Sequence, residues 1–359
     1  IALTLLPTPS LSLDQVRVGE MNAEGKPLLT AERVQAALAP MALLKGEIHF
    51  TEATIDAPVA TLGPEGVRLP KGTVASGFGA PESVSLERLL IRDGVLVVAR
   101  PGKEPLTFSA IAGEIEVTSL IGPVKGNASF LFEDNRRLVR FSVGKVDRGL
   151  TRVKTLIEDP QTAVRIDIDG QAAFNPAAGK VFDGTATLIA NPALGADEKV
   201  QVPVNATTKL RVADGVAHLD EMTLSIGAEP QPATFAGAGR VTVAARPSYD
   251  LTLAARSYDF DRPGADGKPR HAVPVDLIRR AMDLAPSPGK PLDLEGRVDL
   301  SLGALIVGGQ TVMAPRLVVS QLPTGLFVER FTADLPGQSR IDFMRDPTAK
   351  IGPIAGNVQ

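Results

Sequence analysis

The acidic residues of this chain include two pairs spaced by two positions, Asp167 with Asp169 and Asp259 with Asp261. Residues two apart on a β-strand project from the same face, so each pair would present two carboxylates side by side. Such carboxylates could bind calcium or serve as acid and base in glycoside hydrolysis. Because the first pair alternates with apolar residues, we expect it to form the solvent face of a strand instead.

Other residue types that carry chemistry are sparse. The three histidines, His49, His218 and His271, do not have the spacing of metal ligands on a helix, and the chain contains no cysteine. Residues 76–79 are glycine-rich, but no phosphate-binding lysine follows them, and the chain has no Gly-x-Ser-x-Gly elbow. We therefore expect no catalytic residues, no metal site and no cofactor.

The composition argues against a nucleic-acid partner. The 359 residues include 38 basic and 41 acidic side chains, for a net charge of −3, and no block of lysine or arginine. Only 4% of the residues are aromatic, so few side chains could stack on bases. The sequence therefore lacks both the basic patches and the aromatic side chains that bind nucleic acid. The 44% hydrophobic fraction is mostly aliphatic, which suits contact with methylene chains and is equally ordinary for a protein core.

Alternation of apolar and polar residues with period two is the dominant pattern and predicts half-buried antiparallel strands. Val164, Ile166 and Ile168 alternate with charged residues, so these three side chains should share a buried face. Asp-Gly turn signals separate such runs and predict a meander of hairpins. The turn signals include Arg92-Asp93-Gly94 and Ala213-Asp214-Gly215, and similar alternation occurs at Ile115 and Val117, Phe130 and Phe132, Phe141 and Val143, Val200, Val202 and Val204, Met222, Leu224 and Ile226, Leu251 and Leu253, and Val298, Leu300 and Leu302.

Glycines open several of the alternating runs, as in Gly126-Asn127-Ala128, Gly170-Gln171-Ala172 and Gly184-Thr185-Ala186. This repetition could mark duplicated units, but glycine before a strand is also ordinary in a hairpin protein. The irregular spacing argues against a strict solenoid.

Helical patterns are few and short. Residues 275–285 carry an apolar stripe between two prolines, residues 41–45 could form one turn, and residues 150–157 are a third candidate. Residues 63–82 and 259–273 are rich in glycine, proline and charge, and we interpret them as a long loop and a junction. The expected fold is mainly β, an elongated, twisted antiparallel sheet with a few short helices. Its expected regions are residues 1–145, 146–262 and 263–359, or one continuous β structure.

Several patches of the sequence resemble, in order, segments of the AsmA family. The clearest is residues 11–58, with the motifs Pro27-Leu28-Leu29-Thr30-Ala31-Glu32-Arg33-Val34 and Leu43-Leu44-Lys45-Gly46-Glu47-Ile48. Further patches lie at residues 5–19, 90–94, 119–126, 305–309 and 333–337. Two features depart from the family. No stretch reaches the roughly 20 apolar residues of a spanning helix, and residues 63–82 have no counterpart.

The resemblance implies a protein anchored in the bacterial inner membrane that projects a β-rich body into the periplasm. Its sheet would curl into an open groove with an aliphatic concave side that binds or conducts phospholipid for envelope and outer-membrane biogenesis. The implied partners are a phospholipid or other envelope lipid, the inner membrane and outer-membrane components, and the implied activity is not enzymatic. The sequence begins at Ile1 within an apolar pattern, so we interpret this point as an internal cut that removed a signal peptide or anchor.

The candidate groove wall lies on predicted strands that flank a turn at residues 133–137. Their apolar faces should form one patch that shields lipid tails from water at roughly 0.8 kcal/mol per methylene. The patch comprises Ile115, Val117, Phe130, Phe132, Phe141 and Val143. Two alternatives stay open. A scaffold or outer-membrane-protein assembly factor would fill the groove with its own side chains and offer edge strands for β-augmentation. A carboxylate-based glycosidase would require the aspartate pairs to face a cleft.

Overall fold

The structure is a computed structural model of the chain. It describes residues 2–4, 9–21, 27–44, 48–62, 84–100, 103–117, 123–175, 179–190, 203–227, 232–242, 247–259, 261, 295–322, 325–345 and 356–358. The predicted helix at 275–285, the predicted loop at 63–82, nearly all of the predicted junction at 259–273, and Val200 and Val202 of one predicted strand lie outside these residues. Among the described residues, no helix has the length and apolarity needed to cross a membrane.

The described part of the chain is almost wholly β-strand, which confirms the expected mainly β fold. The chain forms two compact units, residues 1–198 and residues 199–359, called unit 1 and unit 2 below. The region boundary expected at residues 145/146 falls within unit 1, between two strands that pair with each other.

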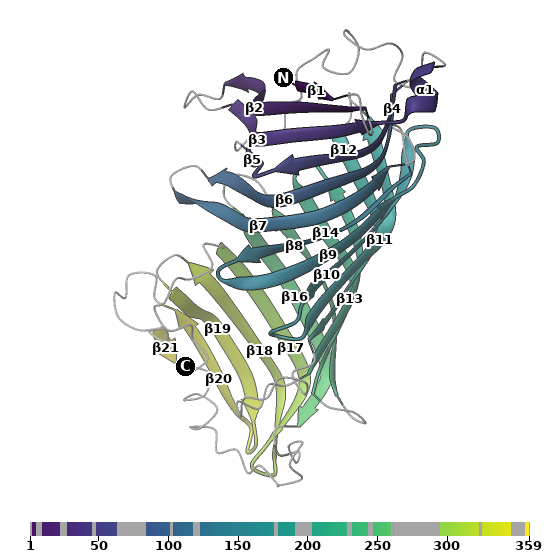
Figure 1. Ribbon diagram of the computed structural model, residues 1–359. Helices are drawn as coiled ribbons and strands as arrows, with labels where there is room; N and C mark the ends of the chain where they lie inside the picture. Colours follow the sequence, from purple (N-terminus) through teal and green to yellow (C-terminus); the bar gives the residue numbers. More distant parts are fainter. Residues whose placement is uncertain are drawn as a thin grey trace. The chain divides into compact units, whose positions relative to one another are not determined.

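Unit 1 is a twisted sheet whose strands lie side by side largely in chain order (Figure 1). One short helix, α1 (Pro40–Leu44), precedes β4 and confirms the single turn expected near residues 41–45. The described strands of unit 1 are β1 (Ala2–Thr4), β2 (Ser10–Met21), β3 (Pro27–Leu38), β4 (Ile48–Asp56), β5 (Val59–Leu62), β6 (Val84–Arg100), β7 (Lys103–Val117), β8 (Val124–Phe132), β9 (Asn135–Val143), β10 (Leu150–Asp159), β11 (Val164–Asn175) and β12 (Gly179–Ala190).

Unit 2 is also built from strands that pair mainly with their neighbours in the chain. Its β13 and β14 are joined at Ala213-Asp214-Gly215, where Asp214 and Gly215 have φ values of 50° and 76°, which confirms the predicted hairpin turn. The described strands of unit 2 are β13 (Val204–Ala213), β14 (Val216–Ile226), β15 (Ala233–Thr242), β16 (Ser248–Asp259), β17 (Glu295–Val307), β18 (Gln310–Leu322), β19 (Gly325–Leu335), β20 (Ser339–Arg345) and β21 (Gly356–Val358).

The sequence led us to expect a purely antiparallel sheet, but the observed pairing is mixed. In unit 1, β4 and β5 both run parallel to β6, and in unit 2, β16 runs parallel to β17. Alternation along a strand reports which side chains share a face, but it carries no information about the direction of the neighbouring strand. The parallel pairs could therefore not be inferred from the pattern.

The predicted turn at Arg92-Asp93-Gly94 is instead a β-bulge inside β6, which continues for 17 residues. The pairing of β6 with β7 shifts between Ile91 and Gly94, and Asp93 has a left-handed φ of 51°. A Cβ on the buried Gly94 would lie 3.1 Å from Cγ of Pro58. The Asp-Gly signal thus correctly indicates a left-handed residue, but here the extra residue bends a strand rather than ending it.

The predicted helix at residues 150–157 is wrong, because this segment is β10 and pairs with β9 and β11. Leu150, Val153 and Leu156 have helical spacing, but Thr151, Val153 and Thr155 also alternate with charged residues. Pairing on both sides satisfies the backbone of the strand, and Thr151 is buried at 3% exposure. Tertiary pairing therefore overrides a weak helical pattern.

An ion pair between a half-exposed arginine and a buried aspartate joins β17 and β18 in unit 2. Arg316 donates two hydrogen bonds to the carboxylate of Asp299, at 2.9 Å from Nε and 2.6 Å from Nη2. The Asp299 side chain is only 10% exposed, and the hydrogen bond from Arg316 lowers the pKa of this carboxyl group below its usual value. A carboxylate with a lowered pKa in the folded state stabilises the protein above its unfolded-state pKa, and this contribution is lost as the pH falls through the folded-state pKa.

We therefore expect Arg316→Gln to destabilise the protein by about 2 kcal/mol at pH 7, since it leaves Asp299 charged and without its main partner. The deficit should shrink as the pH drops below about 4, because Asp299 is then protonated in the unfolded chain, and it should vanish once the pH falls through the lowered folded-state pKa of the wild-type carboxyl group. Urea denaturation followed by circular dichroism at pH 7 and pH 3 measures both values. A deficit of equal size at the two pH values would contradict the assigned role of Asp299.

Candidate functional site

The strand register places all the predicted groove-wall residues on one face of unit 1. Residues directly opposite each other on antiparallel strands share a face. Ile115 of β7 lies opposite Gly126 of β8, which in turn lies opposite Phe141 of β9. The same register and the alternation along each strand bring Ile115, Val117, Phe130, Phe132, Phe141 and Val143 to this side.

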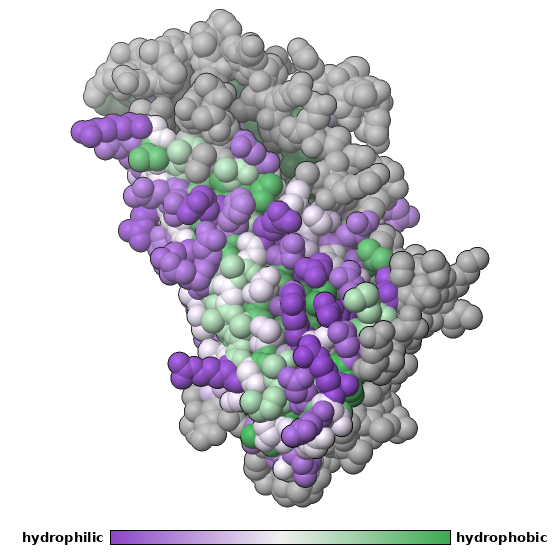
Figure 2. Space-filling model, turned by 180° about the vertical axis from the view of Figure 1, so that it is seen from behind, coloured by the Kyte–Doolittle hydropathy of each residue, from purple (hydrophilic) through white to green (hydrophobic). Residues whose placement is uncertain are grey.

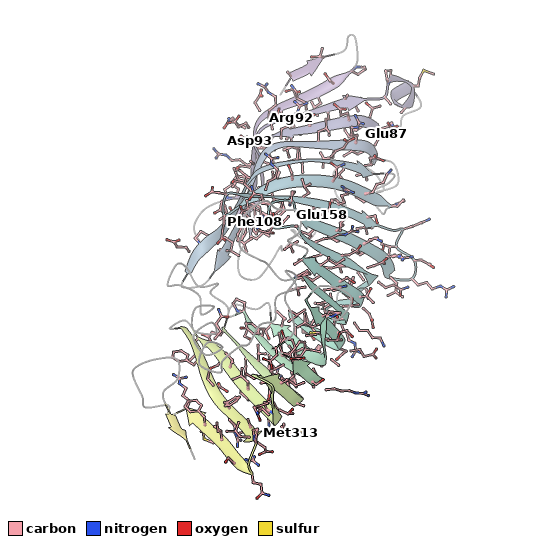
Figure 3. All side chains as sticks on the ribbon, turned by 90° about the horizontal axis from the view of Figure 1, so that it is seen from below. Glu87, Arg92, Asp93, Phe108, Glu158 and Met313 are labelled. Carbon is pink, nitrogen blue, oxygen red and sulfur yellow. The ribbon has the colours of Figure 1, made fainter. Side chains whose placement is uncertain are left out.

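Phe108 of β7 belongs to the same face, although the sequence analysis did not select it. Its ring stacks on Phe132 with centroids 5.0 Å apart and meets the Phe130 ring edge-on at 5.5 Å. Figure 3 shows Phe108 among a dense group of side chains. A bulge at Ala110, where φ is 48°, interrupts the alternation of β7. Phe108 is therefore out of step with Ile115 and Val117, although all three side chains lie on the same face. The alternation of Leu106 and Phe108 before the bulge is the signal that could have found it.

The face continues across β10, β11 and β12. Ile166 lies opposite Ile157 of β10 and opposite Leu188 of β12. The register therefore confirms that Val164, Ile166 and Ile168 share an apolar side of the sheet. We call the side that carries the wall residues, Phe108 and these residues the apolar face of unit 1.

The apolar face of unit 1 is only half-buried. In the part of the chain that the structure describes, no side chain is fully buried, and each of the six predicted wall residues keeps partial exposure. An ordinary sheet covers its apolar side with a second layer of protein and buries it more completely. Apolar surface is therefore left on this face for further contact.

Unit 2 has an equivalent apolar face that is more tightly packed. Met222, Ala233, Phe235 and Leu253, from β14, β15 and β16, form a buried cluster with exposures of 7–8%. The partly buried side chains around it are Leu219, Leu224, Ile226, Leu251, Ala255, Tyr258, Val298, Leu300 and Leu302. These positions include the alternating residues predicted at 222–226, 251–253 and 298–302, which confirms their common side.

Glycines lie within the strands on the apolar faces, at points where neighbouring atoms approach closely. Gly170 and Gly184 are directly opposite each other, and a Cβ on Gly184 would lie 2.6 Å from Cα of Gly170. A Cβ on Gly126 would lie 2.9 Å from the Phe141 ring, and one on Gly296 only 2.1 Å from the Tyr249 ring. Crowding of this kind on one side of a sheet is typical of the inner side of a curved sheet.

The other face of unit 1 carries cross-strand ion pairs. Arg88 Nε lies 2.8 Å from Glu114, and Lys125 Nζ lies 2.7 Å from Glu116. Figure 2 shows one side of the molecule where hydrophilic residues are interspersed with apolar ones rather than gathered in one patch. We call the face with these ion pairs the polar face of unit 1.

The aspartates considered as catalytic or calcium-binding pairs have structural partners. Asp169, on the polar face, accepts hydrogen bonds from Arg152 at 3.0 and 3.1 Å, and these lower the pKa of its carboxyl group. Asp167 lies 3.7 Å from Arg165. The Asp261 carboxylate accepts hydrogen bonds from the backbone N–H groups of the turn at residues 308–309, at 2.8 and 2.7 Å. Across the described ranges, no three histidine, aspartate or glutamate side chains are grouped so that they could hold a metal ion.

One charged residue pair occupies an end of the apolar face of unit 1. Arg137 of β9 lies 2.8 Å from Asp159 of the neighbouring strand β10, and the Asp159 side chain is 7% exposed. Burial opposes ionisation of Asp159, but hydrogen bonds from Thr162 and from the Gln161 N–H, together with Arg137, outweigh it, so its pKa is lowered. The Asp159 carboxylate thus orders the turn between β10 and β11.

Comparison with protein families, with curated proteins and with solved structures found no match to this chain.

Proposed function

We propose that this chain is the periplasmic part of an inner-membrane-anchored, AsmA-like protein that binds or conducts phospholipid acyl chains. Its role would be lipid handling in envelope and outer-membrane biogenesis. The observation that supports this most directly is the apolar face of unit 1, whose aliphatic and phenylalanine side chains share one side of the sheet and stay partly exposed.

The energetics of such contact favour a hydrocarbon ligand. Transfer of one methylene from water to an apolar surface contributes about 0.8 kcal/mol when the methylene is fully covered. An acyl chain that lies against a wall has about half of its surface removed from water, so about ten methylenes would contribute on the order of 4 kcal/mol. This is enough for reversible binding, and the polar head group would stay in water at the open side.

The crowded glycines support a concave apolar side. Side-chain and backbone atoms converge above Gly126 and Gly184, which lie on the same face as the predicted wall residues. A sheet that curves toward this face brings more side chains around a bound chain than a flat sheet could. The proposed groove therefore has the apolar face as its inner wall.

The test is native mass spectrometry of the purified chain, which reports co-purified phospholipid directly. Phe132→Glu should reduce the lipid bound per protein at least about fivefold, because it places a charge in the wall. Leu131→Glu is the matched control, since Leu131 is the preceding residue of β8 and projects from the opposite face. It should leave the bound lipid unchanged.

A second measurement is needed in case the Phe132 variant loses lipid because it partly unfolds, since the substitution also removes the ring stack with Phe108. A photo-crosslinking residue at Ile115 should capture lipid, whereas one at Glu116 on the polar face should not. If the wild-type protein carries no lipid, or if both faces crosslink equally, the lipid proposal fails. The scaffold alternative, in which a protein partner covers the apolar face, would then take its place.

A further inference from the structure

One row of residues across the polar face of unit 1 alternates in the sign of its charge. Opposite charges facing each other across strands attract, whereas like charges repel. From β6 to β11 the row runs through directly opposed residues, Arg88, Glu116, Lys125, Ser142, Lys154 and Asp169. At the position between the two lysines, where an acidic residue would complete the alternation, the chain has a serine.

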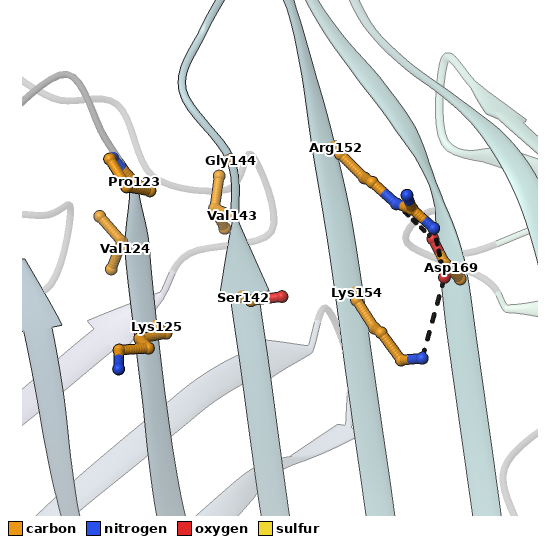
Figure 4. A pocket seen from close by; sticks show the side chains of 9 residues that line it. All are labelled: Pro123, Val124, Lys125, Ser142, Val143, Gly144, Arg152, Lys154 and Asp169. Atoms are coloured by element: carbon orange, nitrogen blue, oxygen red, sulfur yellow. Dashed lines mark hydrogen bonds and ion pairs between the residues drawn. The ribbon is translucent and has the colours of Figure 1, made fainter.

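A depression of about 420 Å³ lies at this break in the row (Figure 4). Its polar lining comes from Lys125, Ser142, Arg152, Lys154 and Asp169, and its apolar lining comes from Pro123, Val124, Val143 and Gly144 at the ends of β8 and β9. The Ser142 hydroxyl is exposed and has no hydrogen-bond partner among the residues that the structure describes. We call this site the Ser142 notch.

The carboxylates around the notch leave positive charge uncompensated. Asp169 already accepts two hydrogen bonds from Arg152, whereas Lys154 Nζ stays 3.9 Å away from it. Figure 4 shows Arg152 and Lys154 both extended toward Asp169. With Lys125 paired to Glu116, three cationic groups share two carboxylates, so one positive charge is in excess.

Both lysines can turn toward Ser142 at small cost. Their side chains are 68% and 54% exposed, for Lys125 and Lys154 respectively. Exposed ion pairs of this kind contribute only about 0–1 kcal/mol, so a stronger anionic ligand can replace the carboxylates as partner. A tetrahedral oxyanion above Ser142 would accept hydrogen bonds from the hydroxyl group and from both ammonium groups, and such charge-assisted bonds are the stronger kind.

We infer that the Ser142 notch binds a phosphate-type oxyanion, supplied either by a soluble phosphate ester or by the phosphate of a lipid head group. The inference stands apart from the proposed binding of acyl chains, because the side chains of Lys125, Ser142 and Lys154 project from the polar face and their binding can be tested with a soluble anion.

The experiment measures binding to the purified chain at low ionic strength. Isothermal titration calorimetry with inorganic phosphate tests the soluble source, and sedimentation with phosphatidylglycerol or phosphatidylcholine vesicles tests the lipid source. Ser142→Asp supplies the missing acid and should weaken binding about tenfold or more, and Lys154→Gln should weaken it about fivefold. Thr223→Asp and Lys209→Gln, on β14 and β13 of unit 2, make the same changes in charge elsewhere and should have little effect.

Phosphate binding that is lost in the notch variants supports a soluble ligand. Binding to phosphatidylglycerol vesicles alone, lost in the same variants, supports a lipid head group. The inference is overturned if the protein binds neither phosphate nor the vesicles. It is also overturned if the notch variants and the unit 2 variants weaken binding to the same extent. A failure of this kind leaves the acyl-chain proposal intact, because that proposal is tested by mass spectrometry on variants of the opposite face.

Discussion

Replacement of Ile166 with aspartate is expected to lower the free energy of unfolding by about 3 kcal/mol, since it puts an unpaired carboxylate among apolar side chains. Ile166 lies between Ile157 and Leu188 on the apolar face of unit 1, and neither neighbour offers a hydrogen-bond donor in its side chain. Urea denaturation monitored by circular dichroism gives the value.

The control is one residue away on the same strand. Asp167 faces the polar side, 3.7 Å from Arg165, so Asp167→Asn should change stability by less than about 0.5 kcal/mol. Equal losses from the two substitutions would show that the assigned faces of β11 are wrong. That result would also remove the support for a wall on this side of the sheet.

Gly184→Ala is expected to destabilise unit 1 by about 2–4 kcal/mol, because the added methyl group has no space. Its Cβ would lie 2.3 Å from the carbonyl oxygen of Asp169 and 2.6 Å from Cα of Gly170. Both are backbone atoms of β11, so the strands would have to separate. A fall in the midpoint of thermal unfolding, followed by circular dichroism, is the measurement.

Gly144→Ala is the matched control for this close approach. A Cβ at Gly144 would lie at least 3.6 Å from its nearest neighbours, which is an ordinary van der Waals contact. The substitution should be neutral or slightly stabilising, because alanine restricts the unfolded chain more than glycine does. A Gly184 variant as stable as the Gly144 variant would contradict the close approach of β11 and β12.

The strands and their sidedness could be predicted from the sequence because alternation is a local property. Val164, Ile166 and Ile168 report their common face without knowledge of the partner strands, and the register confirms it. Local patterns fail where a partner decides the outcome. Residues 150–157 have mixed spacing, and only pairing with β9 and β11 selects the strand.

The bulge at Asp93 and the glycines of the apolar face show a second limit. Asp-Gly and glycine-led runs were interpreted as turns and strand starts, since these are their commonest roles. In the folded chain Asp93 lies within β6, and Gly170 and Gly184 lie within paired strands. Their role depends on curvature, which is a property of several strands together and leaves no signal in a single one.

The candidate site was partly accessible to sequence reasoning. The common face of the six predicted wall residues could be predicted, because they lie on strands adjacent in the chain. Phe108 was not selected, because the bulge at Ala110 interrupts the alternation of β7. The Ser142 notch could not be found from sequence, because its two lysines are 29 positions apart and come to flank Ser142 only through the register of β8, β9 and β10.

In the described part of unit 1, each strand pairs with strands one or two places away in the chain, as β8 does with β7 and β9 and as β4 does with β6. Such a sheet behaves as a one-dimensional array in which stability is a sum of nearest-neighbour terms. Folding can then begin at a hairpin and spread to the neighbouring strands, because most pairings join strands that are close in the chain. The cost of this arrangement is weak long-range cooperativity, so the outermost strands should fray while the central hairpins stay formed.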